Sequence, residues 1–514
     1  MIDTPPPVRK AGKPLWPRIP PGFVRSVLAG HSALGLAFAA LIYLVCFSGT
    51  VAVFAHEFQR WERPAAPMVH SVTPAAVQRT MEQAQAAFGQ PAEHINMILP
   101  TPELPRLVVT ADVGHGQVER TWYADASGTL AGDGEATWTR FMSDLHIYLH
   151  LPRSWGMFVV GLTGVALLSS LISGILAHPR VFKDAFHLRW GGSKRLQEAD
   201  LHNRAGVWAL PFHLIVSLTG ALLGLTTFVV GVLAMVVFQG DMNKVYEMFI
   251  GPAPIDDPRG APLPNLVGML ETVERLSPGS LPTYVGVEHP NERGQGAYIT
   301  ARQPDRLAYG DAFTFGPGGA LIRHSDIDRV TVGERILNVL GALHFGWFGG
   351  WPIKIAYGVL GAGLTAVTSS GVAIWLARRR DKGRPAPRWE RIWIATVWSQ
   401  PLAYAVSLLV AVVAPTFPPL AAWAGATVLA LSVGGFWTVD RISARLRTLA
   451  GVLLIVTAGS HGVLAAASST DPIAWAVDLA LAALGLALIA TVVPRRMRPG
   501  GRAPKALPPA TAGA

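Results

Sequence analysis

The sequence predicts a mainly α-helical protein that crosses a membrane several times. Half of its 514 residues are apolar, only 15% are charged and its mean hydropathy is +0.35, which is typical of membrane proteins. A spanning helix needs about 20 consecutive apolar residues. Eight such runs occur, at residues 27–55, 155–177, 205–238, 353–376, 392–414, 418–438, 448–468 and 474–493. We therefore expect eight transmembrane helices.

Basic residues indicate the orientation of these helices. Lys and Arg gather before residue 27, in 177–204, 376–393 and 440–447, and after residue 494, whereas the turns 414–418 and 468–472 have none. Because short cytoplasmic segments are enriched in Lys and Arg, we expect both termini to be cytoplasmic. The same rule explains the net charge of +10 without a nucleic acid partner. Cys46 is the only cysteine, which excludes disulfides and iron–sulfur clusters within the chain.

The first and third apolar runs share a pattern that begins with a histidine. His31 and His202 are each followed by a glycine four residues later, and by a hydroxyl–glycine pair 17 and 18 residues later. These pairs are Ser48-Gly49 and Thr219-Gly220. Two helices are therefore expected to carry histidine at the same depth, with His202 at the mouth of its helix.

The second and fourth runs repeat a complementary pattern. Leu145-His146 and Leu343-His344 precede them, and each run contains a Ser-Gly pair. The glycine of that pair follows the histidine by 28 residues in the first case and 27 in the second. We interpret the chain as a tandem duplication of one unit, helix, long loop and helix.

Each long loop has the pattern of a small α+β module on the outer face. In residues 57–153, a capped helix is expected at 73–89 and strands at 94–100, 105–113 and 119–130. In residues 240–351, a helix is expected at 265–276, with Asn265 as its cap, and strands at 283–289, 296–302 and 311–322.

These patterns divide the chain into six segments. They are a cytoplasmic tail (1–26), a first repeat (27–177), a cytoplasmic loop (178–204), a second repeat (205–376), a four-helix accessory bundle (377–493) and a basic cytoplasmic tail (494–514). The loop is too short for a flavin or nicotinamide domain, and it contains no glycine-rich phosphate-binding motif. Any electron donor is therefore expected to be a separate molecule.

The duplicated histidines are the strongest candidates for a functional site, because ionisable side chains are costly inside a membrane. We expect His31 and His202 to pair near the cytoplasmic surface, and His146 and His344 near the outer surface. Two layers of paired imidazoles are what two b-type haems need as axial ligands. His213 is an alternative to His202, three turns deeper on the same stripe, and His150 is an alternative to His146. His56 is expected at the surface.

Four motifs in order resemble the PepSY-associated transmembrane family of bacterial inner-membrane proteins. They are HSALGL from His31, LHIYLHLP from Leu145, DLHNRAGVWALPF from Asp200 and LHFGWFGGWP from Leu343, and the resemblance spans about residues 20–380. It implies that the outer loops are PepSY-like periplasmic modules. Members linked to iron acquisition include ferric-siderophore reductases of the ferrioxamine type, which implies two b-type haems and a ferric siderophore, of the hydroxamate type, as substrate.

Together these observations favour a transmembrane electron conduit. Electrons would enter from a cytoplasmic flavoprotein, ferredoxin or membrane quinol and leave at the outer face, where they would reduce the siderophore-bound iron. Oxygen ligands of that kind hold ferric iron far better than ferrous iron, so that one electron releases the metal. Two alternatives remain open: a siderophore or peptide permease with helices broken at mid-membrane, and a membrane-anchored regulatory or binding protein.

Overall fold

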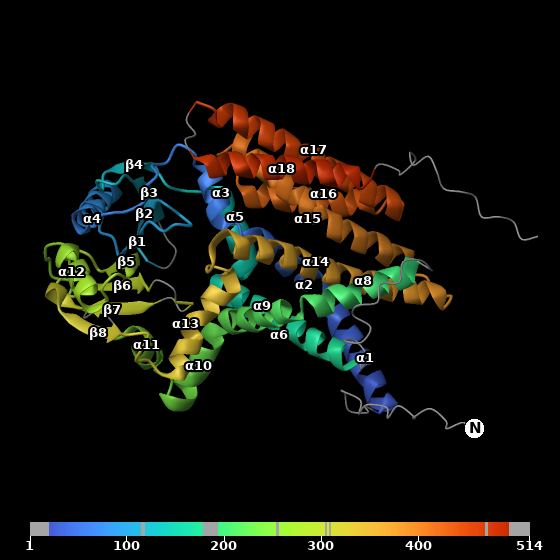
Figure 1. The fold of residues 1–514 in the computed structure, drawn as a ribbon, viewed down its shortest axis with the longest axis horizontal. Helices are drawn as coiled ribbons and strands as arrows, with labels where there is room; N and C mark the ends of the chain where they lie inside the picture. Colours follow the sequence, from blue (N-terminus) through green and yellow to red (C-terminus); the bar gives the residue numbers. More distant parts are fainter. Residues whose placement is uncertain are drawn as a thin grey trace, which may run out of the picture.

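The structure is a computed structural model that describes residues 20–114, 119–177, 194–252, 256–303, 306–307, 310–467 and 471–492. The predicted tail 494–514, most of the amino-terminal tail and residues 178–193 of the predicted cytoplasmic loop lie outside the described residues. An eight-stranded sheet forms one end of the molecule and a group of long helices extends away from it (Figure 1).

A multi-pass membrane protein with a small antiparallel sheet is confirmed, with between five and eight spans among the described residues. Five helices are long and apolar enough to cross a bilayer: α6 Arg153–Ala177, α14 Gly350–Asp381, α15 Pro387–Val413, α17 Val439–Ala465 and α18 Pro472–Ala490. Three bent pairs qualify only as pairs: α1 Pro21–Ala37 with α2 Ala39–Ala52, α8 Lys194–Trp208 with α9 Leu210–Gly224, and α10 Thr226–Val237 with α11 Met242–Ile250. The 418–438 run forms the shorter helix α16, Pro419–Gly434.

The third apolar run does not form one straight helix. Helices α8 and α9 meet at Ala209 with a bend of 71°. Pro211 follows at once and has no N–H to donate to the preceding turn, which explains the break. The residues before the bend also differ from the expectation, since residues 194–204 are helical rather than part of a loop. His202 therefore lies within a helix and not at its mouth.

The two long loops, residues 57–153 and 240–351, contribute to a single antiparallel sheet. Its strand order is β4-β3-β2-β1-β5-β6-β7-β8, so the halves join where β1 pairs with β5. The strands are β1 His94–Ile98, β2 Leu107–Asp112, β3 Glu119–Ala124, β4 Leu130–Asp133, β5 Leu281–Glu288, β6 Gly296–Arg302, β7 Asp311–Phe315 and β8 Leu321–Ser325. The predicted strands are thus present, but the sequence patterns did not indicate that the two modules share one sheet.

Helices α4 Pro74–Phe88 and α12 Leu266–Leu276 pack on this sheet. Both begin at the predicted caps, where Thr73 accepts from the Ala76 N–H and Asn265 from the Gly268 N–H. Met81 and Met269 enter one core together with strand residues of both halves, including Ile95 and Val285. The two halves therefore bury a common apolar layer.

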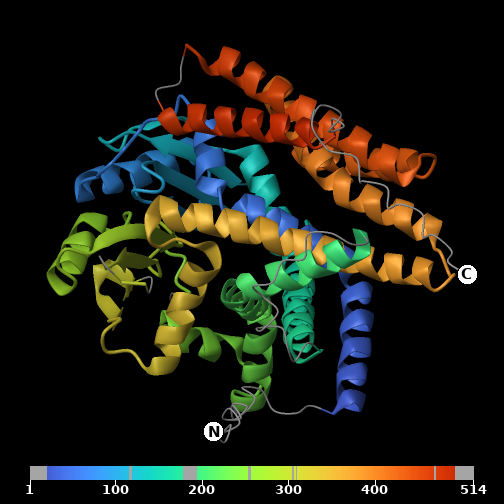
Figure 2. The ribbon, with the colours of Figure 1, turned by 45° about the vertical axis from the view of Figure 1, so that its right-hand side comes forward.

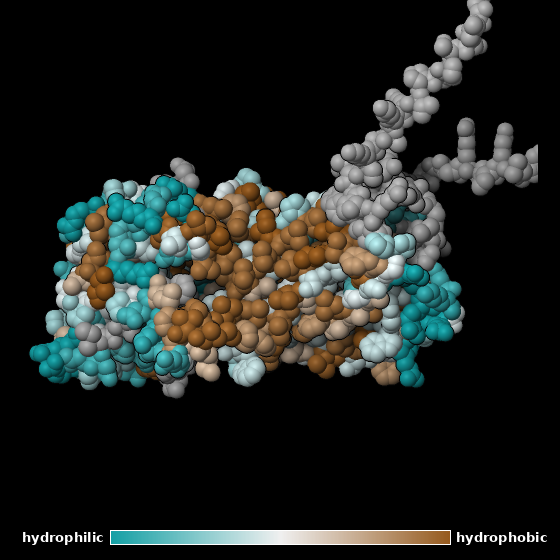
Figure 3. Space-filling model, turned by 90° about the horizontal axis from the view of Figure 1, so that it is seen from below, coloured by the Kyte–Doolittle hydropathy of each residue, from teal (hydrophilic) through white to brown (hydrophobic). Residues whose placement is uncertain are grey.

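The remaining short helices connect the sheet to the membrane-spanning part. They are α3 Ala55–Glu62, α5 Thr137–Tyr148 and α13 Val332–Phe345. Helix α14 crosses the molecule between helices α15–α18 and helices α6, α9 and α10, as the turned view shows (Figure 2). The space-filling view shows a continuous apolar band between two hydrophilic ends, one of them formed by the sheet (Figure 3). Such a band is what contact with lipid requires.

Candidate functional site: two pairs of histidines

The structure brings His146 and His344 together beside the sheet end of the membrane helices. His146 lies near the end of α5 and His344 near the end of α13. Their ring centroids are 6.1 Å apart and the ring planes are inclined by 14°. Each half of the duplication thus supplies one imidazole to this outer pair.

Both outer rings are tethered through Nδ1. The Nδ1 of His146 donates to the Val45 carbonyl over 3.1 Å and lies 3.4 Å from the hydroxyl of Ser48. The Nδ1 of His344 lies 3.1 Å from Oγ1 of Thr219. Because the Thr219 hydroxyl donates its own hydrogen to Ile215, it accepts from His344. Each imidazole therefore carries its hydrogen on Nδ1 and its lone pair on Nε2.

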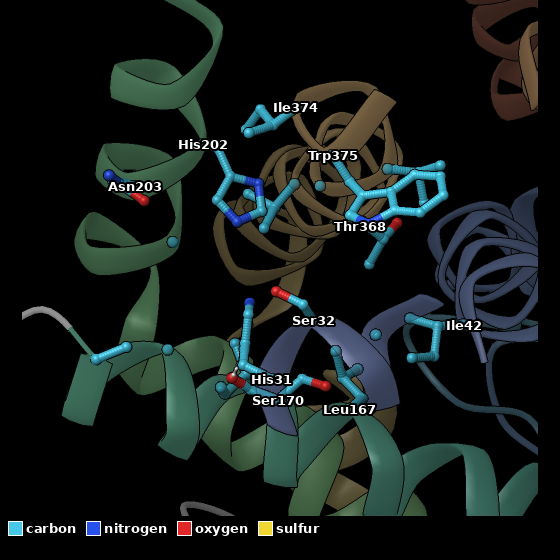
Figure 4. Close-up of a pocket in the computed structure, with 18 of the residues that line it drawn as sticks. His31, Ser32, Ile42, Leu167, Ser170, His202, Asn203, Thr368, Ile374 and Trp375 are labelled. Carbon is cyan, nitrogen blue, oxygen red and sulfur yellow. Dashed lines mark hydrogen bonds between the residues drawn. The ribbon is translucent and has the colours of Figure 1, made fainter. Parts of the chain in front are cut away.

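His31 of α1 and His202 of α8 form the corresponding inner pair. Both line an apolar cavity of about 210 Å³ between α1, α6, α8 and α14, and their rings point into it (Figure 4). The Nδ1 of His31 donates to the Ser170 carbonyl over 2.9 Å, and the Nδ1 of His202 lies 2.9 Å from the Ser370 hydroxyl. That hydroxyl donates to the Val367 carbonyl and so accepts from His202, which again places the lone pair on Nε2.

The duplicated hydroxyl–glycine pairs explain how each ring is held. The hydroxyls of Ser48, Thr219, Ser173 and Ser370 face Nδ1 of His146, His344, His31 and His202, respectively, and the glycine that follows each hydroxyl residue lies against Cε1 of the same ring. A Cβ added to Gly49 would lie 2.6 Å from Cε1 of His146, and one on Gly220 would lie 2.7 Å from Cε1 of His344. The equivalent distances are 3.5 Å for Gly174 to His31 and 3.4 Å for Gly371 to His202. The sequence pattern had marked these pairs as repeat signatures, but not as the supports of the histidines.

The alternative histidines are placed differently. His213 is fully buried beside Phe212 and does not line the inner cavity. The Nε2 of His150 lies 2.9 Å from the carbonyl of Phe141, on whose ring the imidazole stacks. His56, which was expected at the surface, is half-buried, and its ring stacks on Trp347 at 5.2 Å.

The paired rings fit a metal that brings its own equatorial ligands. The described residues contain no group of three or more His, Cys, Asp or Glu that could hold a bare ion, whereas a haem iron needs only two axial imidazoles. Arg378 lines the inner cavity, where a cation would suit the acidic substituents of a haem.

Taken together, the bent apolar helices, the shared sheet and the tethered histidines define a multi-pass membrane protein built from two equivalent halves. Residues 28–378 match the PepSY-associated TM region. The chain therefore belongs to the PepSY-associated transmembrane family, and the resemblance seen in its motifs is confirmed. It is also similar to an uncharacterized protein of Pseudomonas aeruginosa, with 27% identity over 352 residues, which cover 62% of this chain and 87% of that protein. The family match ends before helices α15–α18.

Proposed function

We propose that the protein is an inner-membrane oxidoreductase that binds two b-type haems and passes electrons to ferric siderophores in the periplasm. The observation that carries the proposal is the repeated two-histidine arrangement. All four imidazoles are tethered through Nδ1, and outer-shell contacts of this kind commonly orient histidine ligands toward a metal.

The chain's own residues would hold and orient the haems. His31 and His202 would supply the axial nitrogens of the inner group, and His146 and His344 those of the outer group. The hydroxyls of Ser173, Ser370, Ser48 and Thr219 would fix the ring orientation. A haem ligated in this way carries one electron at a time by cycling between ferric and ferrous iron.

The position of the outer pair next to the sheet supports an acceptor on that side. A ferric siderophore, of the hydroxamate type, suits this role because its hard oxygen ligands lose most of their affinity when the iron becomes ferrous. The donor would be a separate cytoplasmic flavoprotein, ferredoxin or membrane quinol. The topology that goes with this direction of transfer has both termini in the cytoplasm and the sheet in the periplasm.

An absorption spectrum of the detergent-purified protein, expressed with ample haem, tests the proposal. We expect b-type α-bands in the dithionite-reduced protein and about two haems per chain, the number that two bis-histidine sites would bind. The variants His31→Ala and His146→Ala should each remove one haem, whereas His150→Ala should remove none. A colourless protein would refute the redox function.

One observation favours a second candidate, a permease for intact siderophores or peptides. Helix pairs α1–α2 and α8–α9 are bent by 68° and 71°, and broken helices are a feature of transporter sites. This candidate does not account for the four tethered histidines. Uptake of labelled siderophore into vesicles by a colourless protein would favour it.

A further inference from the structure

Helices α15–α18, which follow the family match, are joined to the first half through α5, the helix that carries His146. The Nε1 of Trp138 on α5 donates to the hydroxyl of Ser407 on α15 over 3.0 Å. Trp138 and Phe141 both pack against the ring of Tyr404, which also lies on α15. One face of α5 is thereby buried against the bundle.

A second connection reaches α5 through α3. The carboxylate of Glu62, the last residue of α3, accepts four hydrogen bonds from the first turn of α5. Its oxygens bind the backbone N–H groups of Trp138 and Thr139 at 2.8 and 3.0 Å, and the hydroxyls of Thr137 and Thr139 at 3.1 and 2.9 Å. A carboxylate in this place satisfies the unpaired donors of a helix N-terminus and interacts favourably with its dipole.

Helix α3 is in turn fixed to the bundle by a buried polar cluster. Asp478 of α18 accepts from Nε1 of Trp61 over 2.8 Å, and its other oxygen lies 2.8 Å from Nδ1 of His461. The Nε2 of His461 lies 2.9 Å from the carbonyl of Trp61. Two turns before Asp478, the cap of α18, Asp471, binds both Arg60 and Arg106, the residue that precedes β2.

From these contacts we infer that the bundle positions His146. Ser407, Tyr404 and Asp478 are positioning residues, because they act on the outer histidine pair only through α5 and α3. The inference rests on the proposed function insofar as it concerns a ligand of the outer haem. The contacts themselves predict a rigid α5 whether or not a haem is bound.

Two serines of α15 allow a matched experiment on the full-length protein. Ser407 receives the hydrogen bond from Trp138, whereas Ser399, two turns earlier and equally buried, donates to the Thr396 carbonyl of its own helix. We expect Ser407→Ala to accelerate hydrogen–deuterium exchange in α5 roughly tenfold, the factor that loss of one buried hydrogen bond predicts for local opening. Ser399→Ala should leave exchange in α5 unchanged.

The outer haem provides the second measurement. In Ser407→Ala, the midpoint potential and the electron paramagnetic resonance signal of one haem should shift while the other haem keeps its values. Asp478→Ala should shift the signals of the same haem, because it loosens α3. Asp478→Asn should keep the wild-type signals, because an amide can still accept from Trp61 and donate to the His461 ring.

The outcomes separate the two proposals. Unchanged exchange in α5 and unchanged haem signals in Ser407→Ala, together with a stable fold, would overturn the positioning role. If Ser407→Ala accelerates exchange in α5 but the wild-type protein binds no haem, the proposed function is refuted. The contact between the bundle and α5 would then still be supported. If Asp478→Ala fails to fold, Ser407→Ala still decides the question, since it removes a single hydroxyl.

Discussion

The two halves of the protein use the same histidine geometry but different outer surfaces. Counting from Ser48-Gly49 and Thr219-Gly220, Trp61 of α3 corresponds to Val232 of α10. Trp61 is buried against the bundle, whereas Val232 is exposed along an apolar helix. The two halves thus share the residues that hold the imidazoles, whereas the faces around these residues differ according to what covers them.

The helices that carry the outer histidines show the same contrast. Counting back from His146 and His344, Trp138 of α5 corresponds to Ile336 of α13. Trp138 is 1% exposed and Ile336 is 54% exposed. An exposed isoleucine beside membrane helices is suited to lipid, whereas an indole needs a partner for its N–H when it is buried. The first half has this partner in Ser407, and the second half has no bundle.

Removing Asp471, the bundle carboxylate that pairs with two arginines of the first half, should have the largest effect. Asp471→Ala would leave Arg60 and Arg106 without their carboxylate in a site where the Arg106 side chain is 0% exposed. Breaking a buried ion pair from one side costs about 3–5 kcal/mol, which thermal unfolding in detergent would measure. Asp328→Ala in the second half is the control, because its ion pair with Arg306 is exposed and worth about 0–1 kcal/mol. Equal losses of stability in Asp471→Ala and Asp328→Ala would contradict the difference between the buried and the exposed ion pairs.

Truncating the two equivalent residues of α5 and α13 tests the difference in burial directly. Trp138→Ala removes a fully buried indole and should destabilise the protein by about 3–5 kcal/mol. Ile336→Ala removes a largely exposed side chain and should change the stability by no more than about 0.5 kcal/mol. Chemical unfolding followed by circular dichroism would measure both. A large loss in Ile336→Ala would show that a partner also covers α13.

The two histidine layers differ in how tightly glycine supports the ring. Alanine at position 49 would place its Cβ 2.6 Å from the His146 ring, whereas at position 174 it would lie 3.5 Å from the His31 ring, an ordinary contact. Gly49→Ala should therefore displace His146 at a cost of about 1–3 kcal/mol, typical of overpacking, and lose one haem from the spectrum. Gly174→Ala should retain both. If only Gly174→Ala lost a haem, the prediction that glycine packs more tightly against His146 than against His31 would be wrong.

Local patterns allowed much of this architecture to be predicted. The caps at Thr73 and Asn265 and the alternation of the strands depend on neighbouring residues, and the structure has them where expected. The pairing of His146 with His344 followed from the duplication. In contrast, the pairing of β1 with β5 depends on two strands almost 200 residues apart that lack a distinguishing motif. The bend at Phe38 likewise has no Pro at or beside it to signal a break.

The role of the bundle could not be predicted because its contacts are long-range. His461 and Asp478 are isolated polar residues in apolar runs, and only the fold brings them to Trp61. The contacts of Ser48 and Thr219 with the histidines were easier to predict, since each of these residues follows a repeated histidine by the same number of residues in the sequence. A rule that pairs every such histidine with the hydroxyl–glycine motif of the other helix in its half would have identified them.

The smallest expected effect concerns acid stability and a carboxylate at the start of β7. Burial alone would raise the pKa of Asp311, but the Ile327 N–H, the Ser277 hydroxyl and the Gln303 amide all donate to it and hold the pKa below its usual value. Because the folded pKa is lowered, the hydrogen bonds to the ionised Asp311 carboxylate stabilise the fold. This stabilisation is complete above the unfolded pKa of about 3.9. It is lost as the pH falls through the folded value.

Asp311→Asn should therefore lower the thermal midpoint near neutral pH and flatten its decline below about pH 4. The first half offers the control, because Glu119 at the start of β3 is more exposed and binds Arg140 at the surface. Glu119→Gln should change the neutral midpoint little, since surface ion pairs contribute about 0–1 kcal/mol. Thermal scans across this pH range would measure both variants. If Asp311→Asn retained the full acid dependence of the wild type, the hydrogen-bonded carboxylate of Asp311 would not contribute to acid stability.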